Sequence, residues 1–196
     1  IRLMKLSHAV ITSVDRDDLP DLGASHWANT LYQIKLLNPE TTTEVLIPDF
    51  QGRTDLIEMI IAAKPDIISH NMETVRRISP TVRSAANYET SLKVINQISK
   101  SGLVAKSGIM VGLGESPSEV EELMDDLLEN GCQILTIGQY LQPSHKHFPV
   151  AAYITPEQFD IYKETGLKKG FKQVESAPLV RSSYHAEKHL INKHKK

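Results

Sequence analysis

Short apolar runs alternate with segments of helical spacing along this chain. Five runs rich in β-branched residues have the length of buried strands, at residues 9–13, 44–47, 66–69, 108–111 and 134–137. Between them, apolar residues recur on one helical face, as in Ala24/Trp27/Leu31/Ile34, Leu92/Ile95/Ile98 and Val120/Leu123/Leu127/Leu128. Such stripes indicate core packing rather than cofactor contacts. The alternation predicts parallel strands joined by helical crossovers.

The sequence also marks where the helices begin and end. The segments 116–119 and 155–158 each offer an N-cap hydroxyl followed by a proline at the first helical position, and Glu119 can reach back to its cap. Gly102, Gly131 and Gly170 follow helical segments and can adopt the left-handed conformation that ends a helix. The helical segments are therefore bounded by local signals.

Polar clusters follow the predicted strands, at residues 12–18, 48–50, 70–73 and 139–142. Parallel strands place ligand chemistry at their carboxyl ends, so these clusters indicate one shared pocket. An eight-fold barrel needs about 250 residues. The 196 residues of this chain therefore predict a smaller, open barrel, an α/β fold that forms a single domain over residues 1–196.

Composition narrows the class of protein. With 40% hydrophobic and 23% charged residues, the chain is typical of an ordinary globular domain. A formal net charge of -2 provides no general attraction for nucleic acid or membranes, although the tail after His185 is locally basic. No apolar run is long enough to span a bilayer and no signal peptide is evident, so we expect a cytoplasmic location. Cys132, the single cysteine, excludes an internal disulfide and reads as a small buried residue.

Two of the polar clusters allow more than one interpretation. Asp15, Asp17 and Asp18 around Arg16 could bind a cation, an ammonium or hydroxyl groups, or could be a solvated loop with an internal ion pair. The segment 70–73 places an amide and a carboxylate where a ribose or an amino-acid group could be held. Alternatively, Asn71 simply caps a helix.

Lys106 stands at the start of the run that leads into the glycine-containing turn 112–115. Buried, it could be the amine of a Schiff-base enzyme, or it could pair with Glu73 or Asp17 across the pocket. The turn lets backbone approach a ligand but lacks the spacing of a dinucleotide fingerprint or a P-loop. His145 and His147 form no HxxxH or HExxH pair, so a mononuclear zinc site is not expected.

The segment Arg181-Ser182-Ser183-Tyr184 presents two hydroxyls and a guanidinium before a terminal helix, which one of the serines could cap. Together with five other segments it closely resembles the lipoyl synthase family, in order and over nearly the whole chain. The six segments are 10–19, 48–53, 70–75, 106–115, 138–144 and 181–186.

The resemblance implies a radical S-adenosylmethionine enzyme on a partial (βα)6 TIM-type barrel, a sulfurtransferase that inserts two sulfur atoms into a protein-bound octanoyl group. In the family, one [4Fe–4S] cluster cleaves S-adenosylmethionine and an auxiliary cluster is consumed as sulfur donor. By analogy, Arg83 would pair with the carboxylate of S-adenosylmethionine and Ser183, in a C-terminal extension at 177–196, would bind the auxiliary cluster. The pocket for S-adenosylmethionine would be lined by Thr12, Asp15, Asn71, Glu73, Lys106, Gln139 and Tyr140.

The chain departs from the family in one respect. The two cysteine triads of the family, C-x3-C-x2-C and C-x4-C-x5-C, are absent, and Cys132 cannot replace them. Both triads precede the matched segments in the family, and residues 2–6 look like the last turn of a helix whose beginning is missing. We therefore expect a fragment that lacks the first strand and the N-terminal extension, and that is inactive and free of clusters as it stands.

The expected partners are octanoylated lipoyl carrier domains, in the H protein or in 2-oxoacid dehydrogenase E2 subunits, and an electron donor protein, with no nucleic acid or membrane. Two alternatives remain. The first is an aldolase-like barrel that uses Lys106 as a Schiff base, which borohydride trapping would reveal. The second is a non-catalytic module that binds carrier domains.

Overall fold

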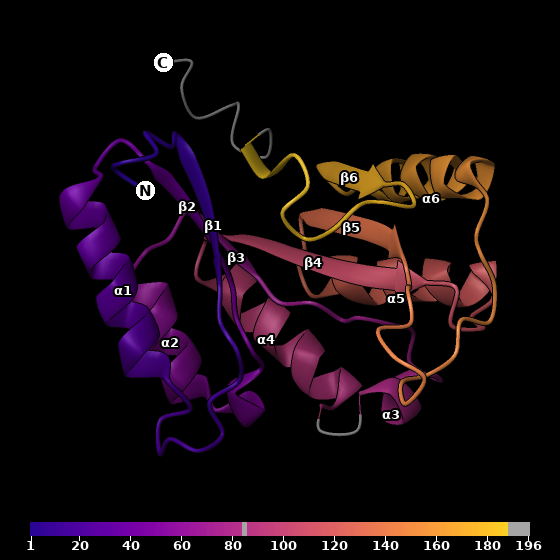
Figure 1. Ribbon diagram of the computed structural model, residues 1–196, viewed down its shortest axis with the longest axis horizontal. Coiled ribbons are helices and arrows are strands. Elements are labelled where there is room, and N and C mark those ends of the chain that lie inside the picture. Colours follow the sequence, from indigo (N-terminus) through magenta and orange to yellow (C-terminus); the bar gives the residue numbers. More distant parts are fainter. Residues whose placement is uncertain (84–85, 188–196) are drawn as a thin grey trace.

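The computed structural model describes residues 1–83 and 86–187 and contains one sheet of parallel strands (Figure 1). The six strands are paired in chain order, from β1 at one edge to β6 at the other. Their bounds are β1 His8–Thr12, β2 Thr42–Leu46, β3 Ile67–Ser69, β4 Val104–Val111, β5 Ile134–Gln139 and β6 Gln173–Ser176. The predicted α/β fold, a partial barrel of parallel strands, is confirmed. The sequence pattern missed β6.

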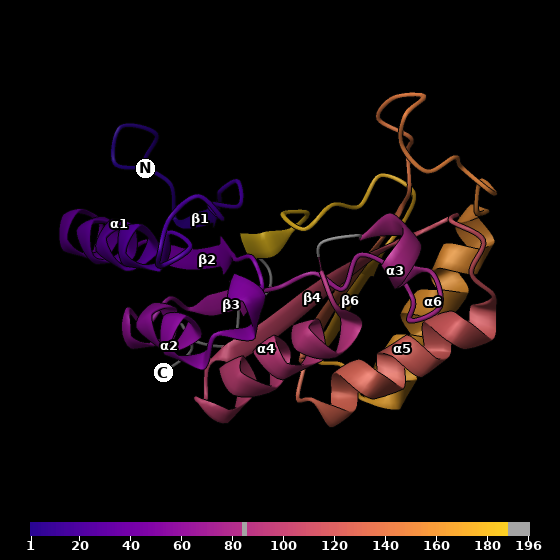
Figure 2. The same cartoon turned by 90° about the horizontal axis from the view of Figure 1, so that it is seen from below.

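A helix follows each of the first five strands on the outer side of the curved sheet, whereas the chain after β6 crosses the inner side (Figure 2). The crossover helices are α1 Ala24–Leu37, α2 Thr54–Ala62, α4 Tyr88–Lys100, α5 Pro117–Glu129 and α6 Pro156–Lys169. A short 3-10 helix, η1 Phe50–Gly52, precedes α2, and a single turn, α3 Ser79–Val82, precedes α4. None of the described helices is long and apolar enough to cross a membrane.

The apolar stripes pack against the sheet, as their spacing predicted. Leu31, Ile95, Ile98 and Leu127 are completely buried in the main core. Burying a side chain of this size contributes about 1.5–3 kcal/mol. Only the ends of the stripes, such as Ile34, are partly exposed. The helices are thereby held to one face of the sheet, which leaves the other face to enclose a ligand.

The helix caps also agree with the sequence signals. Ser116 accepts a hydrogen bond from the backbone N–H of Glu119, whose side chain accepts in return from the backbone N–H of Ser116. This reciprocal capping box fixes the start of α5. Thr155 accepts from the N–H of Gln158 at the start of α6. Both prolines occupy the first turn, where their missing N–H costs nothing.

The segment after β6 lies against β5 inside the barrel. The N–H of Gln139 donates to the carbonyl of Pro178 at 3.1 Å. A Cβ atom at Gly138 would lie only 2.2 Å from the carbonyl oxygen of Val180, so this close approach requires glycine. Residues 182–185 form turns. The expected terminal helix and most of the basic tail fall on residues 188–196, outside the described residues.

Candidate functional site

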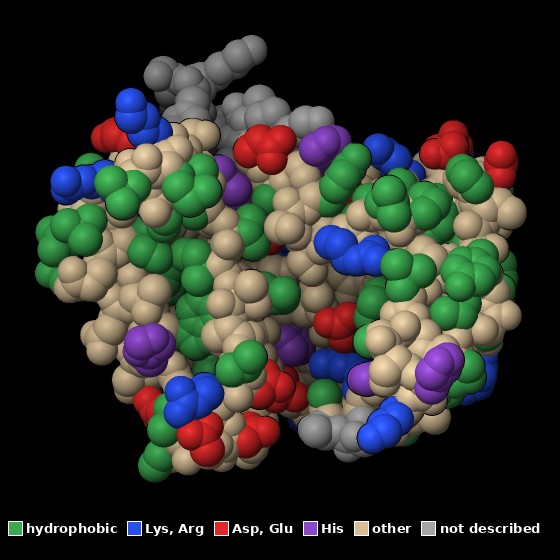
Figure 3. Space-filling view, viewed as in Figure 1, with side chains coloured by type: hydrophobic (Ala, Val, Ile, Leu, Met, Phe, Trp, Pro, Cys, Tyr) green, Lys and Arg blue, Asp and Glu red, His purple; other side chains and the backbone are tan. Residues whose placement is uncertain are grey.

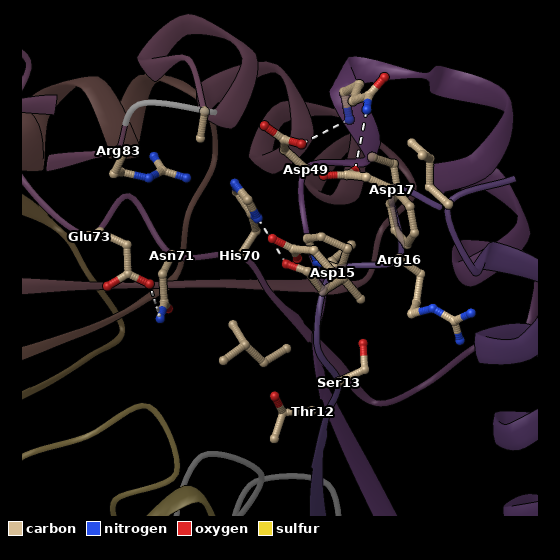
Figure 4. Close-up of a pocket in the computed structure, with 17 residues that line it drawn as sticks. Thr12, Ser13, Asp15, Arg16, Asp17, Asp49, His70, Asn71, Glu73 and Arg83 are labelled. Carbon is tan, nitrogen blue, oxygen red and sulfur yellow. Dashed lines mark hydrogen bonds between the residues drawn. The ribbon is translucent and has the colours of Figure 1, made fainter. Parts of the chain in front are cut away.

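Two adjoining cavities lie at the carboxyl ends of the strands, where the polar clusters were predicted to meet. The first, of approximately 330 Å³, is lined by the segments after β1, β2 and β3 together with Arg83 (Figure 4). The second, of approximately 310 Å³, lies between β1, β2, β4, β5 and residues 180–183. Thr12, Leu46, Asn71 and Glu73 line both. Each volume is at the lower end of the range of small-molecule sites.

On the surface, the molecule is hollowed near its centre, with acidic, basic and histidine side chains around the hollow (Figure 3). Of the predicted site residues, the structure brings Thr12, Asp15, Asn71, Glu73 and Arg83 to the first cavity. It brings Ser183 to the second. Residues from three strand ends and from the C-terminal segment therefore share one region.

The loop of residues 15–18 after β1 has features of both interpretations, an internal ion pair and carboxylates that face a pocket. Arg16 donates to both carboxylate oxygens of Asp18, at 2.8 and 2.7 Å, in an exposed ion pair that contributes little to stability. Asp17 accepts from Nε2 of Gln51 at 3.3 Å. Asp15 and Asp17 line the first cavity, as do the carboxylates of Asp49 and Glu73. In the described ranges, no group of three or more His, Cys, Asp or Glu side chains could hold a metal ion.

Asn71 and Glu73 form the boundary between the two cavities. Nδ2 of Asn71 donates to Oε1 of Glu73 and to the hydroxyl of Ser182, both at 3.0 Å. Its Oδ1 is buried and accepts no hydrogen bond from the described residues. Leaving such a group unsatisfied costs about 1–3 kcal/mol, which a ligand donor would recover. Asn71 caps no helix, since α3 begins only at Ser79.

Glu73 has an unusual backbone conformation. Its φ of 64° lies in the left-handed region, which costs about 1–3 kcal/mol for a residue with a side chain. Two backbone hydrogen bonds hold it there, from its N–H to Gly108 and to its carbonyl from Met110. Burial raises the pKa of the Glu73 carboxyl, while the hydrogen bond from Asn71 and the charge of Arg83 oppose this shift. Strain of this kind is often found at functional sites.

Lys106 lies beneath the site rather than in it. Its side chain is fully buried, lines neither cavity, and donates to Oε1 of Glu44 at 2.6 Å and to the carbonyl of Ser182 at 2.5 Å. Burial lowers the pKa of the Lys106 ammonium, and the carboxylate of Glu44 opposes that shift. Pairing with a carboxylate was one of the two interpretations, but the partner is Glu44 and not Glu73 or Asp17. This geometry does not favour a Schiff-base lysine, because the amine has no access to a ligand.

The sequence analysis overlooked Glu44, although a charged residue within an apolar run was a signal. Glu44 is the third residue of β2 and is completely buried. A fully buried carboxylate needs a paired cation, and Lys106 provides it. The side chains of the pair hold the C-terminal segment, through the carbonyl of Ser182, to the inside of the sheet.

Gln139 and Tyr140 contact a loop instead of the cavities. Oε1 of Gln139 accepts from the N–H of Ile154 at 2.8 Å, and its Nε2 donates to the carbonyls of Tyr140 and Ala152. The hydroxyl of Tyr140 donates to the carbonyl of Phe148 at 2.7 Å. Neither residue lines either cavity. Both hold the long connection between β5 and α6 against the sheet.

The glycine-containing turn after β4 is closed by its own carboxylate. Glu115 accepts hydrogen bonds from the backbone N–H groups of Gly112 and Leu113. A Cβ atom at Gly112 would collide with the amide of Gln139 at 2.2 Å. Gly112 therefore serves the close packing against Gln139, and the turn lines neither cavity.

Comparison with solved structures supports the fold at low sequence identity. A domain of pyruvate-formate lyase-activating enzyme from Bacteroides vulgatus superposes with a TM-score of 0.63 at 11% identity, covering 85% of this chain and 98% of that domain. SuiB from Streptococcus suis superposes with a TM-score of 0.65 at 12% identity, covering 96% of this chain and 43% of that protein.

Comparison of sequences gives much closer relatives. A family model described as the radical SAM superfamily matches residues 1–127. Lipoyl synthase from Bacteroides fragilis strain YCH46 is 82% identical over 190 residues, which cover 97% of this chain and 66% of that protein. The corresponding proteins of Phocaeicola vulgatus and Treponema denticola are 78% and 60% identical, with coverage of 67% and 66% of their lengths. This chain thus spans about two thirds of the length of its relatives, and it belongs to the lipoyl synthase family of the radical SAM superfamily.

Proposed function

We propose that this chain is the part of a lipoyl synthase that binds S-adenosylmethionine and encloses the acyl substrate. The complete protein would insert two sulfur atoms into an octanoyl group carried on a lipoyl carrier domain. One observation supports this most directly: a polar cavity and a more apolar cavity adjoin at Asn71 and Glu73, beneath the C-terminal serines. We also propose that residues 1–196 form one domain, with 177–196 as its C-terminal extension.

The residues of the first cavity fit S-adenosylmethionine. The orphaned Oδ1 of Asn71 can accept from an amine or a hydroxyl, and the guanidinium of Arg83 can bind a carboxylate. The carboxylate of Asp15 can accept from an ammonium or a ribose hydroxyl. S-adenosylmethionine would supply, on one-electron reduction, the species that removes hydrogen from the acyl chain. The role of this chain would be to hold the two reactants in contact and to exclude water.

The second cavity suits an acyl chain. Its walls include Val10, Leu46, Ile109, Met110 and Val180, and residues 180–183 cover one side of it. Gly108 and Gly138 also line this cavity, and their lack of side chains lets Asn71, Thr136 and the carbonyl of Val180 pack closely against the strands. An aliphatic chain here would lie next to the ligand of the first cavity. Orienting the two groups in this way is a large part of the barrier reduction that an enzyme can provide.

An iron–sulfur cluster does not fit the described residues as a ligand set. Cys132 is buried in the core, where burial raises the pKa of its thiol to about 12, whereas iron binds thiolate. Of the family's proposed ligands, this sequence contains only Ser183. The two [4Fe–4S] clusters would belong to the complete protein, with Ser183 as the one ligand contributed from this chain.

The proposed partners follow from the family. They are octanoylated carrier domains, in the H protein or in 2-oxoacid dehydrogenase E2 subunits, and an electron donor protein, in the cytoplasm. The aldolase-like alternative is not favoured because Lys106 is enclosed by Glu44 and Ser182.

The test uses the complete protein that contains this chain, reconstituted anaerobically. Calorimetry should show binding of S-adenosylmethionine, and octanoylated carrier should trigger release of 5′-deoxyadenosine. Asn71→Ala should weaken binding about tenfold or more, because two or more hydrogen bonds near the ligand are lost. Asn29→Ala makes the same chemical change on the exposed face of α1 and should leave binding unchanged.

Three results would contradict the proposal. The first is equal binding by the Asn71→Ala and wild-type proteins. The second is trapping of a substrate on Lys106 by borohydride. The third is tight carrier binding without any turnover by the reconstituted protein, which is the outcome expected of a non-catalytic carrier-binding module.

A further inference from the structure

A chain of hydrogen bonds runs from Arg83 into the core behind the first cavity. Nη1 of Arg83 donates to the hydroxyl of Ser91 at 3.1 Å. Ser91 lies on α4 and its hydroxyl is 2.9 Å from Nε2 of His70. Nδ1 of His70 is 3.0 Å from the carbonyl of Ile47. Ser91 and His70 are 0% and 3% exposed, so water does not compete with these bonds.

The direction of each bond in this chain is determined by its two ends. The carbonyl of Ile47 can only accept, so Nδ1 of His70 carries the proton. Burial, with a smaller contribution from the charge of Arg83, lowers the pKa of His70 to about 4 against the opposing effects of the Ile47 carbonyl and Asp49, so the ring is neutral near pH 7 and its Nε2 accepts. The hydroxyl of Ser91 therefore donates to His70 and accepts from Arg83. The hydroxyl of Ser91 and both ring nitrogens of His70 are thus used in one consistent arrangement.

The same bonds determine which edge of the guanidinium remains available. Nη1 carries two hydrogens, and they go to the carbonyl of Met72 and to the hydroxyl of Ser91, both at 3.1 Å. Within residues 1–83 and 86–187, Nε and Nη2 of Arg83 donate to no protein group and Arg83 forms no ion pair. Because the guanidinium is planar, fixing Nη1 at two points fixes the plane and leaves the Nε–Nη2 edge for a ligand.

The surroundings of Arg83 suit a ligand that carries both a negatively charged group and a positively charged group. Arg83 lines the first cavity and lies between Glu73 and the side chains of His70 and Asp49 (Figure 4). The carboxylates of Glu73, Asp49 and Asp15 are near enough to oppose the lowering of its pKa that burial causes. An amino acid group fits this pattern, since its carboxylate would meet Arg83 while its ammonium would face the acidic side chains.

We propose that Ser91 and His70 are positioning residues that orient the Nε–Nη2 edge of Arg83 for bidentate binding of the ligand's carboxylate. This inference rests on the proposed function for the identity of the ligand, S-adenosylmethionine. Ser91 lines neither cavity, and His70, which does line the first one, has both ring nitrogens bonded to protein groups, so neither residue exchanges a proton with the ligand. The hydroxyl of Ser91 aligns the guanidinium, and His70 aligns that hydroxyl. Two parallel N–H···O bonds demand such alignment, whereas a single bond would not.

The experiment removes the hydroxyl of Ser91 in the complete, reconstituted protein. Calorimetry compares Ser91→Ala with wild type for two probes, S-adenosylmethionine and its decarboxylated counterpart. The dissociation constant for S-adenosylmethionine should rise about tenfold, the loss expected when one charge-assisted bond becomes misaligned. Binding of the decarboxylated probe should change less than twofold, since it has no carboxylate for Arg83. General damage to the fold would weaken both probes together.

Kinetics give a second measurement of the same role. Carboxylate binding is equally strong in the ground state and the transition state, so KM for S-adenosylmethionine should rise while kcat stays within about twofold. Ser91→Thr keeps the hydroxyl and should restore most of the affinity. Ser79→Ala is the matched control, because Ser79 is a buried helical serine whose hydroxyl has no hydrogen-bond partner among the described residues. It should leave both probes and both kinetic constants unchanged.

Should Ser91→Ala fail to fold, Ser91→Cys keeps nearly the same volume with a weak donor, and the same selective loss is expected of it. Equal weakening of the two probes, or no weakening of either, overturns the positioning role while leaving the proposed function intact. Failure of wild-type protein to bind S-adenosylmethionine overturns the proposed function, and the inference with it.

Discussion

Replacing Lys106 with methionine should destabilise the chain by about 3–5 kcal/mol, the usual effect of removing one partner of a buried ion pair. Lys106 and Glu44 are both completely buried, with Nζ and Oε1 2.6 Å apart. Methionine has a similar length but no charge, so the carboxylate of Glu44 would stay in the core without its ammonium. The variant also loses the hydrogen bond to the carbonyl of Ser182.

The magnitude follows from two opposing effects. At a separation of 2.6 Å and an effective dielectric constant of about 20, the attraction is roughly 6 kcal/mol. Desolvation of both groups offsets much of this attraction in the native protein, so the pair itself adds little net stability. After the substitution, the desolvation of Glu44 persists without the attraction. The decrease in the free energy of unfolding should therefore be about 5 kcal/mol, at the upper end of the usual range of about 3–5 kcal/mol.

Urea denaturation provides the assay, with the single tryptophan as its probe. Trp27 is 5% exposed on α1 and should report the loss of core packing by fluorescence. The control is the double variant Lys106→Met with Glu44→Leu, which removes both charges. It should recover most of the lost stability, because replacing a buried pair with apolar residues is often neutral or stabilising.

Hydrogen exchange tests the second role of Lys106, which is to hold the C-terminal segment through the carbonyl of Ser182. The amide of Tyr184 donates to the carbonyl of Arg181 in a turn that contains Ser182, whose carbonyl accepts from Lys106. Exchange in this turn should be faster in both the single and the double variant, because neither retains that contact. A loss of less than about 1 kcal/mol in Lys106→Met, or a double variant as unstable as the single one, would refute the reasoning.

Three other predictions concern titration, packing and reactivity. His70 is neutral in the folded protein down to about pH 4 but protonates near pH 6.5 when unfolded. The free energy of unfolding should therefore decrease by up to about 3 kcal/mol as the pH falls from 6.5 to 4. A His70→Gln variant whose unfolding free energy depends on pH as steeply as that of wild type would contradict this. Gly138→Ala should displace residues 180–183 and make them sensitive to limited proteolysis, since its Cβ would lie 2.2 Å from the carbonyl of Val180. The control is Gly102→Ala, where the space is open but φ is 83°. It should destabilise the fold by roughly 1–2 kcal/mol and leave residues 180–183 protected. Cys132 should react with iodoacetamide only in denaturant, because its thiol is buried and its pKa is raised to about 12; rapid labelling of the native protein would show that the strand entry opens.

The elements that the sequence predicted are those with strong local signals. The runs that became β1 to β5 are short, apolar and rich in β-branched residues, and the helices carry apolar stripes and caps such as Ser116. The strand β6 was missed because only Val174 and Ser176 of its residues are buried, which leaves too few apolar positions to stand out. An edge strand is paired on one side only, so pairing with β5 decides its structure more than its own composition does.

The sequence identified part of the candidate site for a similar reason. Parallel strands bring their carboxyl ends to one edge, so Thr12, Asn71 and Glu73 were expected to meet, and they line one cavity. The direction in which a side chain points is not a local property. Gln139 also lies at the carboxyl end of a strand, yet its side-chain amide bonds to Ile154 and lines neither cavity.

By itself, the sequence determined the alternation of strands and helices, the polar strand ends and the family, because periodicity, caps and motifs are encoded in neighbouring residues. Only the tertiary structure decided that Lys106 pairs with Glu44, that Ser182 accepts from Asn71, and that Ser91 stands between Arg83 and His70. Apart from Arg83 and Ser91, these partners are more than 20 residues apart in the chain. Whether two such groups meet depends on how every crossover helix packs, and the free energy that brings them together comes from burial of the whole core rather than from any one segment.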